Sequence, residues 1–340
     1  MMQIDGSFGE GGGQIIRSSL ALAALTGKGV EITNVRAGRK KPGLQRQHLV
    51  AVRAAAEVSN GLIQGDELGS THLVFEPGHI TGGFFDLPIG TAGSTSLVMQ
   101  TILMPLLFAD QQSTLTIGGG THNPMAPPFE FLRDAYLPNL RAMCADVTIR
   151  MHRAGYFPVG GGRVEVTVNP VKRLQGIELM ERGERRSAHA LIRLAKLPRH
   201  IAEREAQALR KSLRWPELTI EIDEQTDAQG PGNAVVLHVG YEHATEVVTA
   251  IGERRKSAEE VAQAAVDEAL AYDAADAPVG EHLADQLMLP LALAGSGRYR
   301  ASCLSLHTRT HAELIQRFLD VPISLKPDAD PDGPGEVVIG

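Results

Sequence analysis

A helix–strand–helix order recurs three times along this chain of 340 residues, and no other feature of the sequence constrains the fold as strongly. Apolar residues at helical spacing indicate the helices, and short β-branched runs indicate the strands. The first two occurrences start about 80 residues apart, at residues 14 and 94, which predicts a repeated supersecondary unit. The three occurrences cover residues 14–25, 29–35 and 48–58, then 94–108, 113–119 and a helix after 127–128, then 281–293, 298–303 and a helix ending at 318.

The third occurrence comes later in the chain than this spacing predicts. It should begin near residue 174, yet its helix begins near residue 281, about 107 residues later. We therefore expect an inserted small domain over residues 184–275 and a large domain formed by residues 1–183 and 276–340. The insert carries a strand over 188–197, a helix over 200–213, a strand over 218–223, two strands within 234–252 and a helix over 258–272. Because helices and strands alternate within each unit, the fold class is α/β (α+β).

Composition and charge narrow the class of protein. Hydrophobic residues make up 43% of the chain, enough for a sizeable core. The net charge of -7 argues against wholesale coating of nucleic acid, but it leaves room for a local basic groove. Only Cys144 and Cys303 occur, no signal peptide is visible, and the longest apolar run, about 97–109, is too short to cross a bilayer. We expect a soluble cytoplasmic protein with no membrane association.

Several common chemical signatures are missing from the sequence. There is no G-x-x-x-x-G-K-[ST], and GSFGEGGGQ does not fit G-x-G-x-x-G, which argues against P-loop and dinucleotide folds. The chain also has no CxxC pair and no HExxH, which removes the common zinc signatures.

A glycine triplet beside a carboxylate marks one candidate site. Glycine-rich turns before a helix usually bind phosphates, so Glu10, just before Gly11-Gly12-Gly13, is either solvated loop or the ligand of a cation that stands beside a phosphate. The stretch RAGRKKPGLQRQH (36–48) holds five cations and no acid. It is either a solvated loop or an anion site, and guanidinium groups suit phosphate well.

Two later stretches also combine reactive side chains. VGEHLADQL (279–287) puts His282 and Asp285 in the first turns of a helix, where Asp285 either complements the helix dipole or holds a ribose while His282 stacks on a base. In SCLSLHTRTHAEL (302–314), Cys303, His307 and His311 are spaced by four, but Cys303 follows a strand, which disfavours a metal site. A neutral histidine here could instead attack phosphorus.

Taken together, these stretches resemble the RNA 3'-terminal phosphate cyclase family nearly from end to end. The resemblance implies three repeats, each a sheet covered by two helices, with an inserted thioredoxin-like α/β domain. The motifs that carry it, in order, are GEGGGQIIRSSLALAALTG, VRAGRKKPGLQRQHL, GTAGSTSLVMQT, GGGTHNPMAPP, PRHIAEREAQAL, QGPGN and VGEHLADQL.

The resemblance also implies a reaction. A histidine takes AMP from ATP, the AMP passes to an RNA 3'-phosphate, and the 2'-OH then displaces it to leave a 2',3'-cyclic phosphate. On this chain the resemblance places the nucleophile at His307 and the ligand of Mg²⁺ or Mn²⁺ at Glu10. It implies that Arg17, Arg36 and Arg39 bind the phosphates. It also implies that the nucleotide is bound by Gln100, Pro127, His282, Leu283, Ala284, Asp285 and Gln286.

The sequence departs from the family pattern at a few places. The flanks of His307 differ from S-C-H-x-x-T-N, and His311 is an alternative nucleophile, although counting back from QRFL (316–319) favours His307. His282 stands where relatives often have tyrosine, and Ala154 replaces a usual basic residue. The alternatives are an inactive cyclase-like protein that binds RNA in ribosome assembly, or an enolpyruvyl transferase with a related repeat. The sequence does not determine the oligomeric state or the natural RNA.

Overall fold

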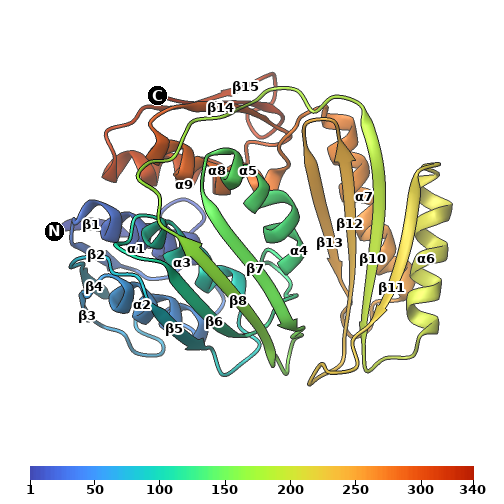
Figure 1. The fold of residues 1–340 in the computed structure, drawn as a ribbon, viewed down its shortest axis with the longest axis horizontal. Coiled ribbons are helices and arrows are strands. Elements are labelled where there is room, and N and C mark those ends of the chain that lie inside the picture. The colour runs from blue at the N-terminus through green and yellow to red at the C-terminus, as the bar shows by residue number, and fades with distance from the viewer.

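Three of the four sheets in the molecule have the same strand order (Figure 1). The computed structural model describes residues 1–340. In each of these three repeats the first strand is parallel to the second, and the second and third strands each pair antiparallel with the fourth. The first repeat, with the sheet order β1-β2-β4-β3, consists of β1 (Met2–Asp5), α1 (Gly13–Thr26), β2 (Val30–Thr33), α2 (Arg46–Val58), β3 (Leu62–Gln64) and β4 (Leu73–Glu76).

The second and third repeats follow the same plan. The second, with the order β5-β6-β8-β7, consists of β5 (Phe84–Pro88), α3 (Thr95–Leu107), β6 (Ser113–Gly119), α4 (Phe129–Phe131), the π-helix η1 (Leu132–Tyr136), α5 (Leu137–Ala142), β7 (Asp146–Arg153) and β8 (Gly162–Asn169). The third, with the order β9-β14-β16-β15, consists of β9 (Glu178–Leu179), α8 (Glu281–Ala294), β14 (Gly297–Ala301), α9 (Leu306–Phe318), β15 (Ile323–Pro327) and β16 (Gly335–Ile339).

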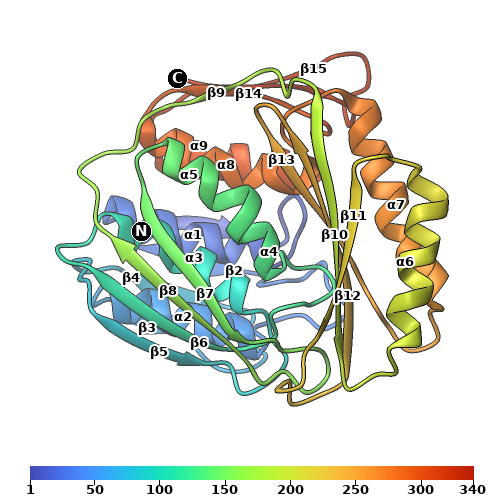
Figure 2. The ribbon, with the colours of Figure 1, turned by 45° about the vertical axis from the view of Figure 1, so that its right-hand side comes forward.

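A fourth sheet lies in the chain between β9 and α8, and we call this segment the β10–α7 unit. One face of its sheet packs with α6 and α7 around a separate cluster of 19 buried hydrophobic residues (Figure 2). The other face contributes residues such as Leu191, Val236 and Val247 to the main cluster of 72 residues. The unit has the sheet order β11-β10-β12-β13 and consists of β10 (Arg185–Ala195), α6 (His200–Leu213), β11 (Leu218–Glu224), β12 (Gly232–Tyr241), β13 (Thr245–Ile251) and α7 (Ala258–Ala275).

The predicted α/β class is confirmed, but one predicted helix is irregular. The segment after Pro127-Pro128 forms α4, the wider turn η1 and then α5 instead of one regular helix. Pro138, near the start of α5, has no N–H to donate to a carbonyl one turn earlier, which accounts for the widened turn before it. The short strands β1, β3 and β9 were not predicted, because two to four residues are too few for a recognisable alternation. The sequence analysis also missed β4, β5, β15 and β16 and the eight-residue strands β7 and β8.

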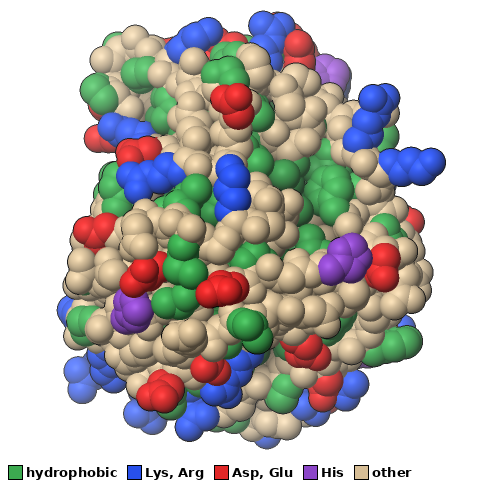
Figure 3. Space-filling model, turned by 90° about the vertical axis from the view of Figure 1, so that its left-hand side faces the viewer, with side chains coloured by type: hydrophobic (Ala, Val, Ile, Leu, Met, Phe, Trp, Pro, Cys, Tyr) green, Lys and Arg blue, Asp and Glu red, His purple; other side chains and the backbone are tan.

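The first helices of the three repeats meet inside the molecule. Helices α1, α3 and α8 are apolar over most of their length and buried on most sides, as expected for helices covered by sheets and by one another. No helix has the length and apolar composition needed to cross a membrane. Acidic and basic side chains are interspersed over the face that is turned to the left in Figure 1 (Figure 3).

Candidate active site

The glycines before α1 leave room for charged side chains to lie against their backbone. A Cβ atom on Gly12 would lie 2.4 Å from Nη2 of Arg39 and 2.5 Å from Oε2 of Glu10. A Cβ atom on Gly13 would lie 2.6 Å from Nη1 of Arg17. Any larger residue would therefore push these groups away from the start of the helix.

Glu10 is almost fully covered, with 4% of its side chain exposed. Its Oε1 accepts hydrogen bonds from the backbone N–H of Gly12 at 2.9 Å and of Gln14 at 3.2 Å, and its Oε2 pairs with Arg39. No group of three or more His, Cys, Asp or Glu side chains is arranged to hold a metal ion. Glu10 could thus supply one carboxylate to a cation, whose other ligands would have to come from water or a bound phosphate.

Three arginines surround this carboxylate. Nη1 of Arg36 donates to the carbonyl oxygens of Lys41 at 2.8 Å and of Gly43 at 2.7 Å, whereas Arg17 makes no hydrogen bond or ion pair within the protein. Burial lowers the pKa of Arg17 to about 10, so it stays charged at neutral pH. Burial and the three arginines also lower the pKa of His48 to about 3. The cluster therefore offers unused donors and positive charge to an anion.

His307 lies exposed in the first turn of α9 and has one ring nitrogen free. Its Nδ1 is 3.1 Å from Oε1 of Gln14, and Nε2 of Gln14 donates to Oδ2 of Asp285 at 2.7 Å. Because the amide nitrogen of Gln14 is used on Asp285, its oxygen must accept from His307. The Nδ1 atom of His307 therefore carries the proton, and the lone pair lies on Nε2, which has no partner.

His311 differs from His307 because both of its ring nitrogens are occupied. Its Nδ1 donates to the backbone carbonyl of Asp285 at 2.7 Å, and its Nε2 accepts from the Ser18 hydroxyl at 3.0 Å. The side chain is buried, and burial lowers its pKa. His311 is thus a neutral residue that joins α9 to α1 and α8, with no lone pair left for attack.

The predicted nucleotide residues on α3 and α8 also come together. Nε2 of Gln100 donates to Oε1 of Gln286, and Nε2 of Gln286 donates to the carbonyl of His282 at 2.7 Å. Burial raises the pKa of Asp285. A small cavity of about 60 Å³ lies among these groups and is lined by Gln14, Arg17, Ser18, Gln100, Tyr136, Asp285, Gln286 and His311, together with the apolar residues Ala21, Met104 and Leu289.

The remaining predicted residues lie around this centre without entering it. His282 is exposed, and its Nε2 is 3.6 Å from Oε1 of Glu268 on α7. Leu283 and Ala284 are buried in α8 and face the core. Pro127 is half-buried in the loop before α4, and no hydrogen bond joins it to the other predicted residues.

The sequence analysis missed several residues that organise the site. Gln14 joins His307 to Asp285, Ser18 fixes His311, and the Thr310 hydroxyl accepts from the backbone N–H of Glu10 at 3.2 Å. Gln14 stands in the quoted motif GEGGGQ, directly after the glycines, so the motif itself was the available signal.

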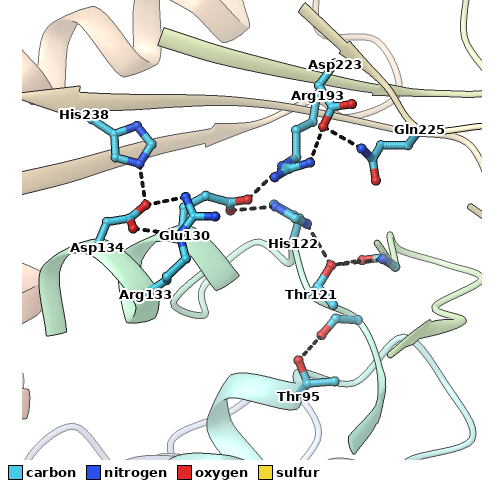
Figure 4. Close-up of polar contacts among 12 residues, drawn as sticks. Thr95, Thr121, His122, Glu130, Arg133, Asp134, Arg193, Asp223, Gln225 and His238 are labelled. Carbon is cyan, nitrogen blue, oxygen red and sulfur yellow. Dashed lines mark hydrogen bonds and ion pairs between the residues drawn. The ribbon is translucent and has the colours of Figure 1, made fainter. Parts of the chain in front are cut away.

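A second polar network holds the loop before α4 against the β10–α7 unit (Figure 4). Nε2 of His122 is 2.8 Å from Oε2 of Glu130, and Nε of Arg193 donates to Oε1 of Glu130 at 2.7 Å. Burial alone would raise the pKa of Glu130, but the charge and hydrogen bond of His122 and the charge of Arg193 hold it well below its usual range. The Thr121 hydroxyl bonds Nδ1 of His122 at 2.8 Å and so fixes the loop from its other side.

The model of the family described as RNA 3'-terminal phosphate cyclase matches residues 8–325 of the chain. The RNA 3'-terminal phosphate cyclase of Ralstonia nicotianae is 47% identical over 330 residues, which cover 97% of this chain and 94% of that protein. The proteins of that name from Pseudomonas fluorescens and Koribacter versatilis are 46% and 44% identical, and they cover 96% of this chain and 95% and 92% of their own lengths. A solved EPSP synthase of Acinetobacter baumannii has a TM-score of 0.26 at 13% identity over 62% of this chain and 54% of that one, too low to carry an argument.

Proposed function

Because the chain belongs to the RNA 3'-terminal phosphate cyclase family, we propose that it uses ATP to convert an RNA 3'-phosphate into a 2',3'-cyclic phosphate through an adenylyl-histidine. In the first step, Nε2 of His307 attacks the α-phosphorus of ATP and pyrophosphate leaves. In the second step, an oxygen of the RNA 3'-phosphate takes the AMP from His307. In the third, the 2'-OH attacks the RNA phosphorus, AMP leaves, and the hydroxyl proton passes to solvent.

The free lone pair on His307 is the observation that carries this proposal. Gln14 holds the Nδ1 proton in place, so the ring presents Nε2 as a nucleophile. After attack the ring carries positive charge, and the Asp285 carboxylate behind Gln14 stabilises that charge through the amide. The same charge makes imidazole a good leaving group when the RNA phosphate attacks.

We assign the arginines and Glu10 to the phosphates of ATP and RNA. The unused donors of Arg17, together with Arg36 and Arg39, neutralise charge that builds up on the leaving pyrophosphate. Glu10 fits a Mg²⁺ or Mn²⁺ ion as its single carboxylate ligand, once Arg39 turns to the phosphate. Such an ion, when bound, would add further neutralisation of the phosphate oxygens.

The nucleoside part of ATP is assigned to the residues of α3 and α8. Gln100 and Gln286 offer amide groups at the cavity, and Asp285 can accept from a ribose hydroxyl. His282 offers an exposed ring for the base, and Pro127 is assigned to its other face. Leu283 and Ala284 support this segment from the core.

The domain boundaries and compartment belong to the same proposal. We divide the chain into a large catalytic domain, residues 1–183 and 276–340, and a small inserted domain, residues 184–275. The separate hydrophobic cluster of the β10–α7 unit supports this division. We place the reaction in the cytoplasm, where both free cysteines would stay reduced.

A 3'-phosphorylated oligoribonucleotide incubated with ATP and Mg²⁺ tests the function. The end should become resistant to phosphatase, with release of AMP and pyrophosphate in equal amounts to the cyclised RNA. An end that stays sensitive to phosphatase, with RNA bound and no ATP consumed, would favour a non-catalytic RNA-binding protein and contradict the proposal.

A further inference from the structure

A second groove lies outside the catalytic cavity, between the free edge of β7 and the β10–α7 unit. Its volume is about 440 Å³. We call it the β7 groove. Its charged lining is mostly basic, with Asp227 as the one acid among the lining residues and with Arg133, Arg150, His152, Arg153 and Arg193 as the basic ones.

Some of these cations are already neutralised and some are not. Arg193 lies between Glu130 and Asp223, and Arg133 pairs with Asp134. Arg150 lies directly opposite Glu165 on β8, although the Glu165 carboxylate is within ion-pair distance of His152, at 3.4 Å, and not of Arg150. Among the arginines that line the groove, Arg153 is therefore the one with no carboxylate paired with it or directly opposite it.

Arg153 also lies opposite a second arginine. A β-bulge in β7 sets Arg153 directly opposite Arg163 of β8, and like charges in that position destabilise a sheet. Arg153 donates only to the carbonyl of Gly161 at 2.6 Å, and Arg163 has no partner. A bound anion would relieve this repulsion.

Exposed apolar side chains lie in the loop that follows the groove residues Arg153 and Ala154. The loop between β7 and β8 presents Phe157, which is 70% exposed, and Val159, which is 47% exposed. This loop packs on the β10–α7 unit, since a Cβ on Gly230 would lie 2.7 Å from Val159. An exposed aromatic ring next to unpaired arginines is the combination that binds single-stranded nucleic acid.

The β7 groove adjoins the catalytic cavity through η1. Tyr136, at the end of η1, lines the catalytic cavity, whereas Arg133, in the same segment, lines the groove. Phe129 also lines the groove, two residues after Pro127. The segment η1 therefore separates the two spaces by only a few residues.

We propose that the β7 groove, together with Arg163 on the adjoining strand β8 and Phe157 in the β7–β8 loop, binds the single-stranded RNA that precedes the 3'-terminal phosphate, with Arg150, Arg153 and Arg163 on its phosphates and Phe157 stacked on a base. This inference rests on the proposed function, because the RNA substrate supplies the occupant. Charge complementarity favours this surface over the face in Figure 3, where acids and bases are interspersed.

The test compares a long 3'-phosphorylated oligoribonucleotide with a 3'-phosphorylated dinucleotide, which is too short to reach the groove. The triple variant R150A/R153A/R163A should raise KM for the long RNA about tenfold and reduce the slope of log affinity against log salt by about 2. Phe157→Ala should raise the same KM about tenfold without changing the salt slope. The KM for the dinucleotide should stay within about twofold, since it lacks the contacts.

The matched control is R210A/K211A/R214A, which removes three exposed cations at the end of α6. It should leave both KM values and the salt slope unchanged. Adenylation of each variant by ATP is measured in the same preparation, so that a misfolded protein or a failure of the proposed function is recognised separately. If adenylation is intact and the triple variant treats long RNA as the wild type does, the β7 groove does not bind RNA.

Discussion

At the scale of residues, His307 and His311 lie one turn apart on α9 but differ in how many of their ring nitrogens have hydrogen-bond partners. His307 faces one amide and keeps a free nitrogen, whereas His311 is held on both sides by Ser18 and the Asp285 carbonyl. Counting back from QRFL (316–319) favours His307, but it does not distinguish the two rings chemically. The direction of the Gln14 amide does, and Asp285 fixes that direction.

Replacing Gln14 with alanine should slow enzyme adenylation by about 10- to 100-fold, because His307 then loses the acceptor that holds its Nδ1 proton. The KM for ATP should change less than kcat, since the ring, not the nucleotide, loses its support. Single-turnover formation of labelled enzyme measures the rate. Gln111→Ala, at an exposed glutamine before β6, is the matched control. Equal rates for Gln14→Ala and the wild type would remove the assigned role of Gln14.

Much of the site could be read from the sequence, but its connections could not. Glu10, Arg17, Arg36 and Arg39 come from two stretches of the first repeat whose composition left a solvated loop and an anion site open, and the family resemblance assigned them to the candidate site. Gln14 and Asp285 are hydrogen-bonded although they lie 271 positions apart in the sequence, and no local sequence pattern predicts such a contact. The distinction between His307 and His311 likewise depends on α1 and α8 together.

At the scale of elements, the long periodic helices were predictable, whereas the eight-residue strands β7 and β8 were not predicted. Helices α1, α3, α6 and α8 begin and end within about two residues of their predicted bounds, because their apolar spacing is regular. The π-helical turn η1 was not predicted, although Pro138 was a visible signal. Short edge strands such as β3 and β9 are defined by their partners in the sheet and not by their own residues.

The network of Glu130 gives a prediction for the join between α4 and the β10–α7 unit. Glu130→Gln should lower stability by about 3 kcal/mol at pH 7, because Arg193 and His122 lose a fully buried carboxylate. The folded-state pKa of Glu130 is depressed, so its contribution is fully present above the usual value of 4.5 and is lost as the pH falls below it. The deficit of the variant should therefore shrink in acid.

Urea unfolding at pH 7 and at pH 4 measures this difference in stability. Glu259→Gln is the matched control, since Glu259 pairs with Arg204 at the surface and its loss should change little. A deficit of Glu130→Gln that stays the same, or grows, at the lower pH would contradict the assigned role of the carboxylate.

At the scale of the whole molecule, the site is built where the three repeats meet. Each repeat contributes its first helix, α1, α3 or α8, and the third adds α9. The sixth residues of these first helices are Ser18, Gln100 and Gln286, and all three line the cavity, with Gln100 bonded to Gln286. The repeated fold thus brings three equivalent helix positions to the same cavity. The β10–α7 unit is not part of this repeat.

Covalent loading of His307 tests the central claim most directly. The protein is incubated with ATP labelled at the α-phosphate and Mg²⁺, then denatured and digested, and the labelled peptide is identified by mass spectrometry. The label should survive denaturation, resist alkali, be lost in acid and lie on His307, and His307→Ala should carry none while His311→Asn still does. An equal amount of label on His307→Ala, or label found on another residue of the wild type, would contradict the account.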